Sequence, residues 1–377
     1  MMDVSVYNGF TGLLDYQASI LQGAGHSTTI VGMASGEPIV TTPTHYVRGT
    51  GARTQARAAV EIVRYALRQR PDLVVLTQAG APLVAPIAMA LRSAAIPLIY
   101  DCMDPVIEVI RSGIGPGPVF YALKPWLIVS HRIIDRSVAA TLSVSPGLDR
   151  ILRMRGWVGP ILRFYNIHGT RLIGRKGFSG VRTAHGWESA TILVYAGGLQ
   201  QGFRGLEDQI RAVSLACRRG LNLRFLIVGY GNPAPFLKIA DECGVAESVR
   251  IMPDMPPAAL ADILADCDVA VSNSLPYALP SKIFEYINNG VRIISINDGN
   301  DVNNLCAEFV ELYDSSLDGL AAALIRVASQ PPAAGDEEKR RGFLEKLRAE
   351  SELALLSCVE TPFSGQKDTT PKLKVQQ

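Results

Sequence analysis

This sequence is poor in charge and has no arrangement of cysteines that would indicate a metal site. Charged residues make up 19% of the 377 residues, and the formal net charge is only +2. So small a charge excludes the strongly basic field of a nucleic-acid-binding protein. The six cysteines are scattered, with no Cys-x-x-Cys pair and no metal-ligand spacing. They predict reduced thiols in a cytoplasmic protein without a structural metal.

Long hydrophobic runs are also missing. The longest apolar stretch, residues 81–100, is interrupted by Pro82, Pro86, Arg92 and Pro97. It therefore predicts a buried helix followed by a buried strand rather than a membrane span. The first ten residues have no basic region ahead of an apolar run, so no signal peptide is expected. A chain of 377 residues predicts two domains.

Short β-rich runs alternate with helical runs, which is typical of parallel sheets flanked by helices. In the first half we expect strands at 4–7, 73–77, 98–102, 141–144 and 161–164, and helices at 52–68, 82–93, 119–138 and 147–154. In the second half we expect strands at 191–196, 224–228, 249–252, 269–272 and 292–296, and helices at 206–218, 234–243, 257–265 and 281–288. The fold class is therefore α/β, with two doubly wound parallel-sheet domains that hold a ligand at the carboxyl ends of their strands.

The domain boundaries follow from changes in composition. The polar, glycine-bearing stretch 168–189 predicts a linker over a cleft between a domain at 1–167 and a second domain at 190–330. Residues 331–363 predict a helix that packs back towards the first domain. The polar residues 364–377 have no apolar period and predict a disordered tail.

Residues 279–295, which read LPSKIFEYINNGVRIIS, predict an anion site at the start of a helix. Pro280 suits a first helical turn, and Ser281 and Lys282 add a hydroxyl and an ammonium to its free backbone amides. Glu285 lies one turn further on, where it faces the same side of the helix. A phosphate site with a carboxylate behind it suits a diphosphate joined to a hydroxylated ring. We therefore predict a nucleotide-sugar as ligand.

The second half resembles the donor-binding domain of glycosyltransferase family 4, whose members have the GT-B fold of two facing Rossmann-like domains with a cleft between them. The resemblance rests on LVYAGGL at 193–199, RGL at 204–206, FLIVGYG at 225–231, VRIM at 249–252, DCDVAV at 266–271 and the helix described above. The first half is similar in four shorter elements: Gly9–Gly12, Gly25–His26, Ser145–Gly147 and Asn166.

The resemblance implies a retaining glycosyltransferase that moves a sugar from a nucleotide-sugar donor to a glycan or lipid-linked glycan in polysaccharide biosynthesis. It implies that Glu285 holds the donor ribose and that Gly9 and Gly12 form a phosphate loop. It further implies a donor nucleotide site lined by Ser281, Gly198, Gly229, Met252 and Tyr277. Tyr277 stands where the family usually has a first glutamate that contacts the donor sugar, and Gly198 stands where it usually has an arginine.

Transfer requires stabilisation of the leaving diphosphate, by a metal or by fixed donors. Asp266 and Asp268 border an apolar strand, and we interpret them as the end of a helix and the entry to a strand. We therefore expect metal-free and cofactor-free catalysis by Arg204, Lys282 and the amides near Ser281. In the first domain Asp104, rather than Asp101, is expected to bind the acceptor or the sugar, with capping of the next helix as the alternative.

Two other functions fit the same residues: a nucleotide-binding pseudoenzyme, suggested by Tyr277, and a sugar-nucleotide epimerase of similar architecture. Loss of transfer on Glu285→Ala with the fold retained would favour the enzyme. The basic, aromatic segment 119–136 predicts either a core helix with a wet basic side or a peripheral contact with an anionic membrane. The second interpretation would place the protein at the inner face of the cell membrane.

Overall fold

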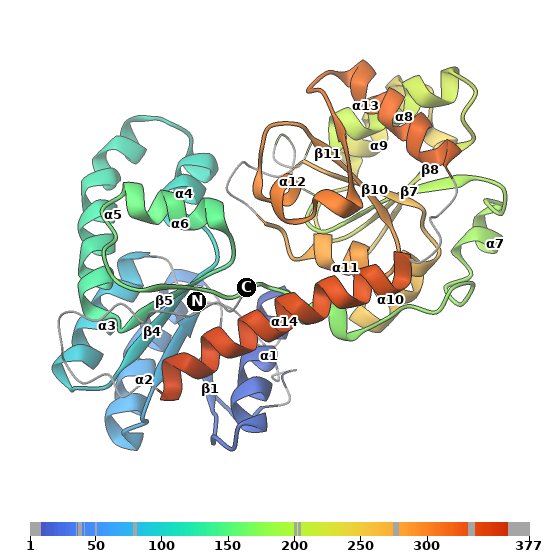
Figure 1. The fold of residues 1–377 in the computed structure, drawn as a ribbon. Helices are drawn as coiled ribbons and strands as arrows, with labels where there is room; N and C mark the ends of the chain where they lie inside the picture. Colours follow the sequence, from blue (N-terminus) through green and yellow to red (C-terminus); the bar gives the residue numbers. More distant parts are fainter. Residues whose placement is uncertain are drawn as a thin grey trace.

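The computed structural model consists of two lobes, each built on a parallel sheet with helices on its faces, and a long C-terminal helix that lies across both (Figure 1). None of the described helices has the length and apolar character needed to cross a bilayer. The structure describes residues 9–34, 36, 40, 42–49, 51–77, 81–199, 202, 205–273, 279–330 and 336–360.

The N-terminal lobe contains a four-stranded parallel sheet in the order β3-β4-β5-β6 and a parallel pair β1-β2. Strand β4 is buried at every position, Asp101 included, as expected for a central strand in a sheet covered on both faces. The predicted strand at 4–7 lies outside the described residues. The elements of this lobe are α1 (Gly9–Gly23), β1 (Ile30–Ala34), β2 (Thr44–Arg48), α2 (Gly51–Gln69), β3 (Val74–Thr77), α3 (Ala81–Ser93), β4 (Leu98–Cys102), α4 (Val106–Ile114), α5 (Pro118–Ser137), β5 (Ala140–Ser143), α6 (Pro146–Met154) and β6 (Ile161–Arg163).

The C-terminal lobe contains a six-stranded parallel sheet in the order β12-β11-β10-β7-β8-β9. The chain runs outwards from β7 through β8 to β9, then returns to the other side of β7 at β10. This reversal makes the carboxyl ends of β7 and β10 the topological switch point, where open α/β sheets bind their ligands. The elements are β7 (Thr191–Ala196), α8 (Leu206–Arg218), β8 (Leu223–Val228), α9 (Ala234–Glu242), η2 (Ala246–Ser248), β9 (Val249–Met252), α10 (Pro257–Ala265), β10 (Val269–Ser272), α11 (Lys282–Asn288), β11 (Arg292–Ile296), α12 (Asp301–Leu305), η3 (Ala307–Phe309), β12 (Val310–Tyr313) and α13 (Leu317–Ser329).

The carboxyl-end side of the N-terminal sheet faces the C-terminal lobe. Gly147, at the start of α6 just after β5, donates its backbone N–H to the Asp301 carboxylate of the C-terminal lobe over 2.6 Å. The C-terminal helix α14 (Asp336–Glu360) packs against both α1 and α11. Its Ser351 hydroxyl accepts the backbone N–H of Tyr165, which lies just after β6. These contacts tie the two lobes together.

The segment between the lobes differs from the predicted linker over a cleft. Only η1 (His168–Arg171) lies at the junction, where Arg171 donates to the Ser19 hydroxyl of α1 over 2.6 Å. The rest, including α7 (Val181–His185), runs along the outside of the C-terminal lobe (Figure 1). The segment is held there by Val181 and Trp187, which are buried in the core, and by arginines that pair with acids around α10 and β10. The pairs are Arg175 with Asp262 and Arg182 with Asp268.

Candidate functional site

Two glycine turns lie side by side at the carboxyl ends of β7 and β8. Gly197 donates its N–H to the carbonyl of Val228 over 2.9 Å, and Leu199 donates to the carbonyl of Tyr230 over 2.8 Å. A Cβ atom on Gly229 would lie 1.8 Å from the carbonyl oxygen of Gly197. Only glycine at position 229 therefore allows the turns to approach this closely, and the edge they form is bare backbone.

Helix α11 brings the ammonium of Lys282 to this edge. Nζ lies 4.0 Å from the centroid of the Tyr195 ring, and a Cβ on Gly197 would come within 2.6 Å of it. The Tyr195 hydroxyl in turn donates to the carbonyl of Gly198 over 2.9 Å. Lys282 follows β10 in the chain and Gly197 follows β7, so the two meet at the switch point of the sheet. A fixed cation beside exposed backbone is suited to bind an anion.

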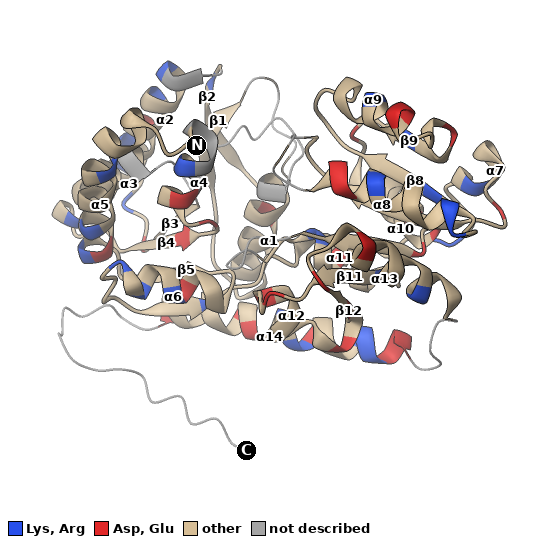
Figure 2. Cartoon of the chain, turned by 90° about the horizontal axis from the view of Figure 1, so that it is seen from above, with Lys and Arg blue, Asp and Glu red and all other residues tan. Residues whose placement is uncertain are grey.

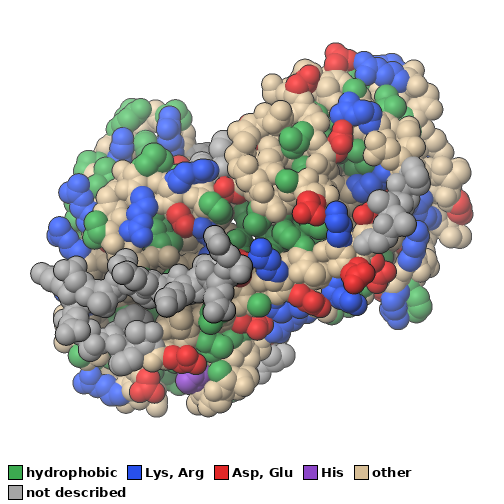
Figure 3. Space-filling view, in the orientation of Figure 1, with side chains coloured by type: hydrophobic (Ala, Val, Ile, Leu, Met, Phe, Trp, Pro, Cys, Tyr) green, Lys and Arg blue, Asp and Glu red, His purple; other side chains and the backbone are tan. Residues whose placement is uncertain are grey.

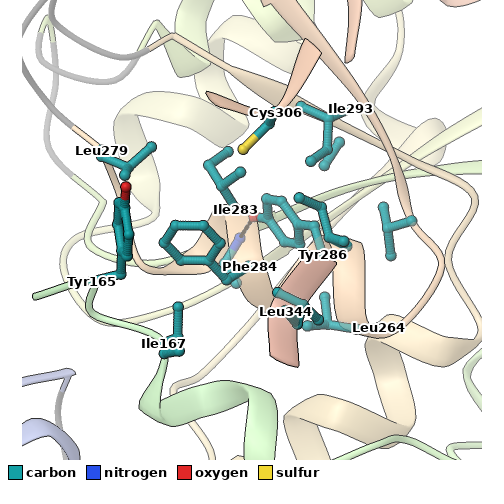
Figure 4. Packing of buried hydrophobic residues seen from close by; sticks show 14 of the residues in the cluster. Tyr165, Ile167, Leu264, Leu279, Ile283, Phe284, Tyr286, Ile293, Cys306 and Leu344 are labelled. Carbon is teal, nitrogen blue, oxygen red and sulfur yellow. Dashed lines mark hydrogen bonds between the residues drawn. The ribbon is translucent and has the colours of Figure 1, made fainter. Parts of the chain in front are cut away.

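A hydrogen bond between Tyr286 and strand β7 fixes α11 in this position. Strand β10 pairs with β7 only at Leu193 and Val194, so the backbone N–H of Ala196 has no strand partner on that side. The hydroxyl of Tyr286 accepts it over 2.9 Å. Two residues earlier on α11, Phe284 packs edge-on against Tyr165, with ring centroids 6.3 Å apart (Figure 4). The helix is thus anchored to its own sheet and to the segment that leaves the N-terminal lobe.

Replacement of Tyr286 by phenylalanine is expected to lower the free energy of unfolding by about 1 to 3 kcal/mol, because it leaves the buried N–H of Ala196 without an acceptor. Urea denaturation measures this difference. Tyr16→Phe is the matched control, since the buried Tyr16 hydroxyl has no hydrogen-bond partner. Its removal should leave stability unchanged or raise it. Equal losses in both variants would show that the Tyr286 bond does not anchor α11.

Glu285 lies one turn along α11 from Lys282, at the junction of the lobes. Its side chain packs directly on Gly169 of η1, where a Cβ would stand only 2.5 Å from the carboxylate. Burial raises the pKa of Glu285, and the nearby ammonium of Lys282 partly opposes this rise. The carboxylate is thus held in a desolvated place beside a cation.

Other predicted donor residues lie around the same edge. Met252 ends β9, and its carbonyl accepts the N–H of Gly229 over 3.0 Å. Ser281 directly precedes α11 without capping it through its side chain. Sequence reasoning passed over Tyr230, which is 63% exposed and has ring atoms 3.3 Å from where a Cβ on Gly198 would stand. The signal that could have identified Tyr230 is its place as an aromatic residue between two glycines of such a turn.

In the N-terminal lobe, Asp101 near the end of β4 and Asp104 just after it have different environments. Asp101 is fully buried and accepts a 2.7 Å hydrogen bond from Gln17. Burial raises its pKa to about 6. Asp104 is only partly buried and stands just before Pro105, the N-cap of α4, which makes no side-chain cap bond. Of the two, Asp104 is therefore the more accessible to a ligand.

The remaining predicted site residues are Gly9, Gly12, Arg204 and Tyr277. Gly9 and Gly12 do not form a loop, because the buried residues Leu13 and Tyr16 extend α1 back to Gly9. The prediction of a phosphate loop there is wrong. Arg204 and Tyr277 lie outside the described residues.

The acids at 266 and 268 are structural, as predicted. Asp266 caps the end of α10 and accepts hydrogen bonds from Gly177 and Ser179, while Asp268 accepts the N–H of Ile192 over 2.7 Å. Within the described ranges, no three His, Cys, Asp or Glu side chains are grouped so that they could hold a metal ion.

The chain is similar to known proteins in one family model and in its fold. Residues 190–330 match the family model described as glycosyl transferases group 1, and no curated protein matches the chain. The fold is similar to that of WaaG, a glycosyltransferase involved in lipopolysaccharide biosynthesis, with a TM-score of 0.62 and 13% identity over 95% of this chain and 97% of that one. For sucrose-phosphate synthase from Thermosynechococcus elongatus the TM-score is 0.70 with 14% identity over 93% and 91%. For Anabaena HepE in complex with UDP-glucose it is 0.65 with 13% identity over 95% of both chains.

These matches confirm the predicted fold class. The chain has the GT-B fold, and its C-terminal lobe is similar over residues 190–330 to the glycosyl transferases group 1.

Proposed function

We propose that this protein is a retaining, family 4 type glycosyltransferase that moves a sugar from a nucleotide-sugar to a glycan or lipid-linked glycan. The observation that carries the proposal is the pairing of Lys282, beside the bare glycine turns at the switch point, with Glu285 one turn further along the same helix. The HepE structure in complex with UDP-glucose supports a UDP-sugar as the donor. Polysaccharide biosynthesis at the inner face of the cell membrane is the proposed setting.

In this mechanism Lys282 stabilises the diphosphate that leaves the anomeric carbon. The ammonium is held over the Tyr195 ring before the substrate arrives, so little reorganisation is needed when negative charge develops. The backbone N–H of Ser281 and the side chain of Arg204 are proposed as further donors to the same phosphates. In this proposal the protein's own cations and amides stabilise the diphosphate, without a metal or cofactor.

Glu285 and Tyr230 are proposed to bind the nucleoside. The carboxylate of Glu285 would accept hydrogen bonds from the ribose hydroxyls, which compensate its desolvation. The exposed Tyr230 ring, over Gly198 and near the end of β9, offers a stacking surface for the base.

On the acceptor side Asp104 is proposed to hydrogen-bond an acceptor or donor hydroxyl from the end of β4. The acceptor oxygen forms the new bond to the anomeric carbon as the bond to the diphosphate breaks, and the departing phosphate takes the acceptor's proton. Retention follows because both oxygens lie on one face of the sugar.

Replacement of Glu285 by glutamine tests the nucleoside site. Because ionised glutamate accepts from ribose more strongly than an amide, the Kd for the nucleotide-sugar is expected to rise about tenfold or more. The wild-type affinity should also weaken as the pH falls through the raised pKa of Glu285, since the protonated carboxyl is a poorer acceptor. Calorimetric titration across this range measures both effects. The intact nucleotide-sugar is the right probe, because its diphosphate does not titrate there.

The free energy of unfolding should change with pH in the direction opposite to donor affinity. An acid whose pKa is raised in the folded state favours folding most at low pH and loses that contribution as the pH rises. Glu285→Gln removes the buried charge, so the Tm of the variant at neutral pH should exceed that of the wild type. Unchanged affinity and unchanged pH dependence in this variant would contradict the proposed site.

Thermal shifts with UDP-, GDP- and ADP-sugars identify the base of the donor. A ligand that saturates the site at about 100 times its Kd adds about 2.7 kcal/mol to the free energy of unfolding.

A further inference from the structure

Helix α5 has an exposed surface that the glycosyl-transfer site does not use. Its residues Tyr121–Trp126 are exposed without interruption, so the first half of the helix stands out from the lobe. The apolar side chains here are large and substantially exposed: Val119 64%, Tyr121 58%, Leu123 42%, Trp126 49% and Val129 45%. The prediction of a core helix with a wet basic side therefore fails for these residues. The inward face of α5 is formed by other side chains, among them Phe120, Leu127 and Ile134.

The charge on and around this surface is of one sign. Figure 2 shows Lys and Arg positions along α5 in blue, and Figure 3 shows basic side chains at the outer edge of the N-terminal lobe. Among the described residues of α3, α4 and α5, no exposed acid is present. Glu108 is paired with Arg155, and Asp135 is buried and accepts the N–H groups of Val158 and Gly159. The exposed cations of these helices are Arg92, Arg111, Lys124, Arg132 and Arg136.

The surface also lies on the side of the lobe where the acceptor must arrive. Helix α5 leads from α4, which follows the carboxyl end of β4, back to the amino end of β5. Its protruding first turns are therefore on the carboxyl-end side of the sheet. The Gly147–Asp301 hydrogen bond shows that this side faces the C-terminal lobe.

We propose that the exposed face of α5 docks the protein on an anionic lipid bilayer. Tyr121, Leu123 and Trp126 would enter the interfacial region, where amphipathic aromatic rings are favoured. Lys124 and the cations further along α5 would lie at the level of the anionic headgroups. A second copy of the chain is disfavoured as the occupant, because the same face would bring like charges together. The membrane contact is independent of the donor proposed above.

Vesicle flotation of the full-length protein tests this surface. Wild-type protein is expected to float with phosphatidylcholine vesicles that contain phosphatidylglycerol, and to be released at about 1 M salt, where the Debye length falls to about 3 Å. The pair Lys124→Glu and Arg132→Glu should lower the partition coefficient by at least about 30-fold, because each lost cation contributes about 1 kcal/mol and each added carboxylate is repelled by the anionic lipid. The pair Leu123→Ser and Trp126→Ser should lower it about tenfold or more. The matched control, Leu353→Ser with Arg218→Glu, changes exposed residues on other faces and should float like the wild type.

Tryptophan fluorescence provides a second measurement. The protein has three tryptophans, of which Trp157 and Trp187 are buried and Trp126 is exposed. Brominated lipids should therefore quench wild-type emission through Trp126, and Trp126→Phe should abolish most of this quenching while the variant still floats. Quenching that survives in Trp126→Phe would overturn the proposed orientation.

Three other outcomes would also overturn the proposal. They are absence of flotation with anionic vesicles, equal flotation with pure phosphatidylcholine, and a concentration-dependent dimer that the α5 variants dissociate while vesicle binding is absent. Nucleotide-sugar affinity of the α5 variants separates this proposal from the previous one. It should equal that of the wild type, so a missing donor site and a missing membrane contact give different results.

Discussion

Replacement of Lys282 by methionine is expected to lower kcat by two to three orders of magnitude, with a much smaller effect on the Kd of the donor. The expected size is that of removing one fixed donor from a developing negative charge, about 2.7 to 4 kcal/mol. Methionine is unbranched like lysine and one heavy atom shorter, so it can still pack on the Tyr195 ring, where the ammonium of Lys282 lies 4.0 Å from the centroid. The substitution therefore removes the positive charge and changes the shape of the side chain only slightly. Single-turnover measurement of sugar transfer separates the chemical step from donor binding.

Lys238→Met is the control for a lysine removed from the same lobe. Lys238 lies on α9, is exposed and pairs only locally with Glu242. Its variant should transfer sugar at the wild-type rate. Lys282→Arg should recover only part of the activity, since the space beside Gly197 fits an ammonium and a bulkier guanidinium must shift away. Wild-type kcat in Lys282→Met would rule out this cation as the group that stabilises the leaving diphosphate.

The C-terminal lobe was the easier half to predict, because its central strands β7, β8 and β10 are buried on both faces. Strands β7 and β10 appear in the sequence as short continuous apolar runs, and their predicted bounds are those observed. The α11 segment could also be recognised, since proline, serine and lysine before a helix carry an anion-binding pattern in a few adjacent residues. Strand β12 was missed because three of its four residues are not buried, so no apolar run marks it.

The N-terminal lobe and the junction were harder, because the deciding contacts join residues far apart in the chain. Gly9 and Gly12 suggest a loop locally, whereas packing of Leu13 and Tyr16 makes the segment helical. The place of Glu285 against Gly169 depends on how the two lobes meet. Likewise, the sequence of α5 fits a core helix and a surface helix equally well. Only the exposure of residues such as Trp126 in the folded chain decides between them.

Gly229→Ala is expected to lower the free energy of unfolding by about 3 kcal/mol or more and to abolish donor binding. The added Cβ would stand 1.8 Å from the carbonyl oxygen of Gly197 and 2.8 Å from its carbonyl carbon. Backbone on both sides must move, because no flexible side chain is there to give way. The movement would separate the turns after β7 and β8 and strain the hydrogen bond from Gly229 to Met252. It would also displace the backbone that Lys282 faces.

The appropriate control is Gly220→Ala, which separates steric overlap from backbone strain. Gly220 has a φ of +91° and open space around its Cα, whereas Gly229 has close backbone contacts and no left-handed φ. Alanine at 220 should therefore lower stability by only about 1 to 2 kcal/mol and leave the Kd for the nucleotide-sugar unchanged. Chemical denaturation and calorimetric titration on the two variants measure both quantities. Wild-type donor affinity in Gly229→Ala would show that the paired glycine turns do not form part of the donor site. The anion would then have to bind elsewhere along α11.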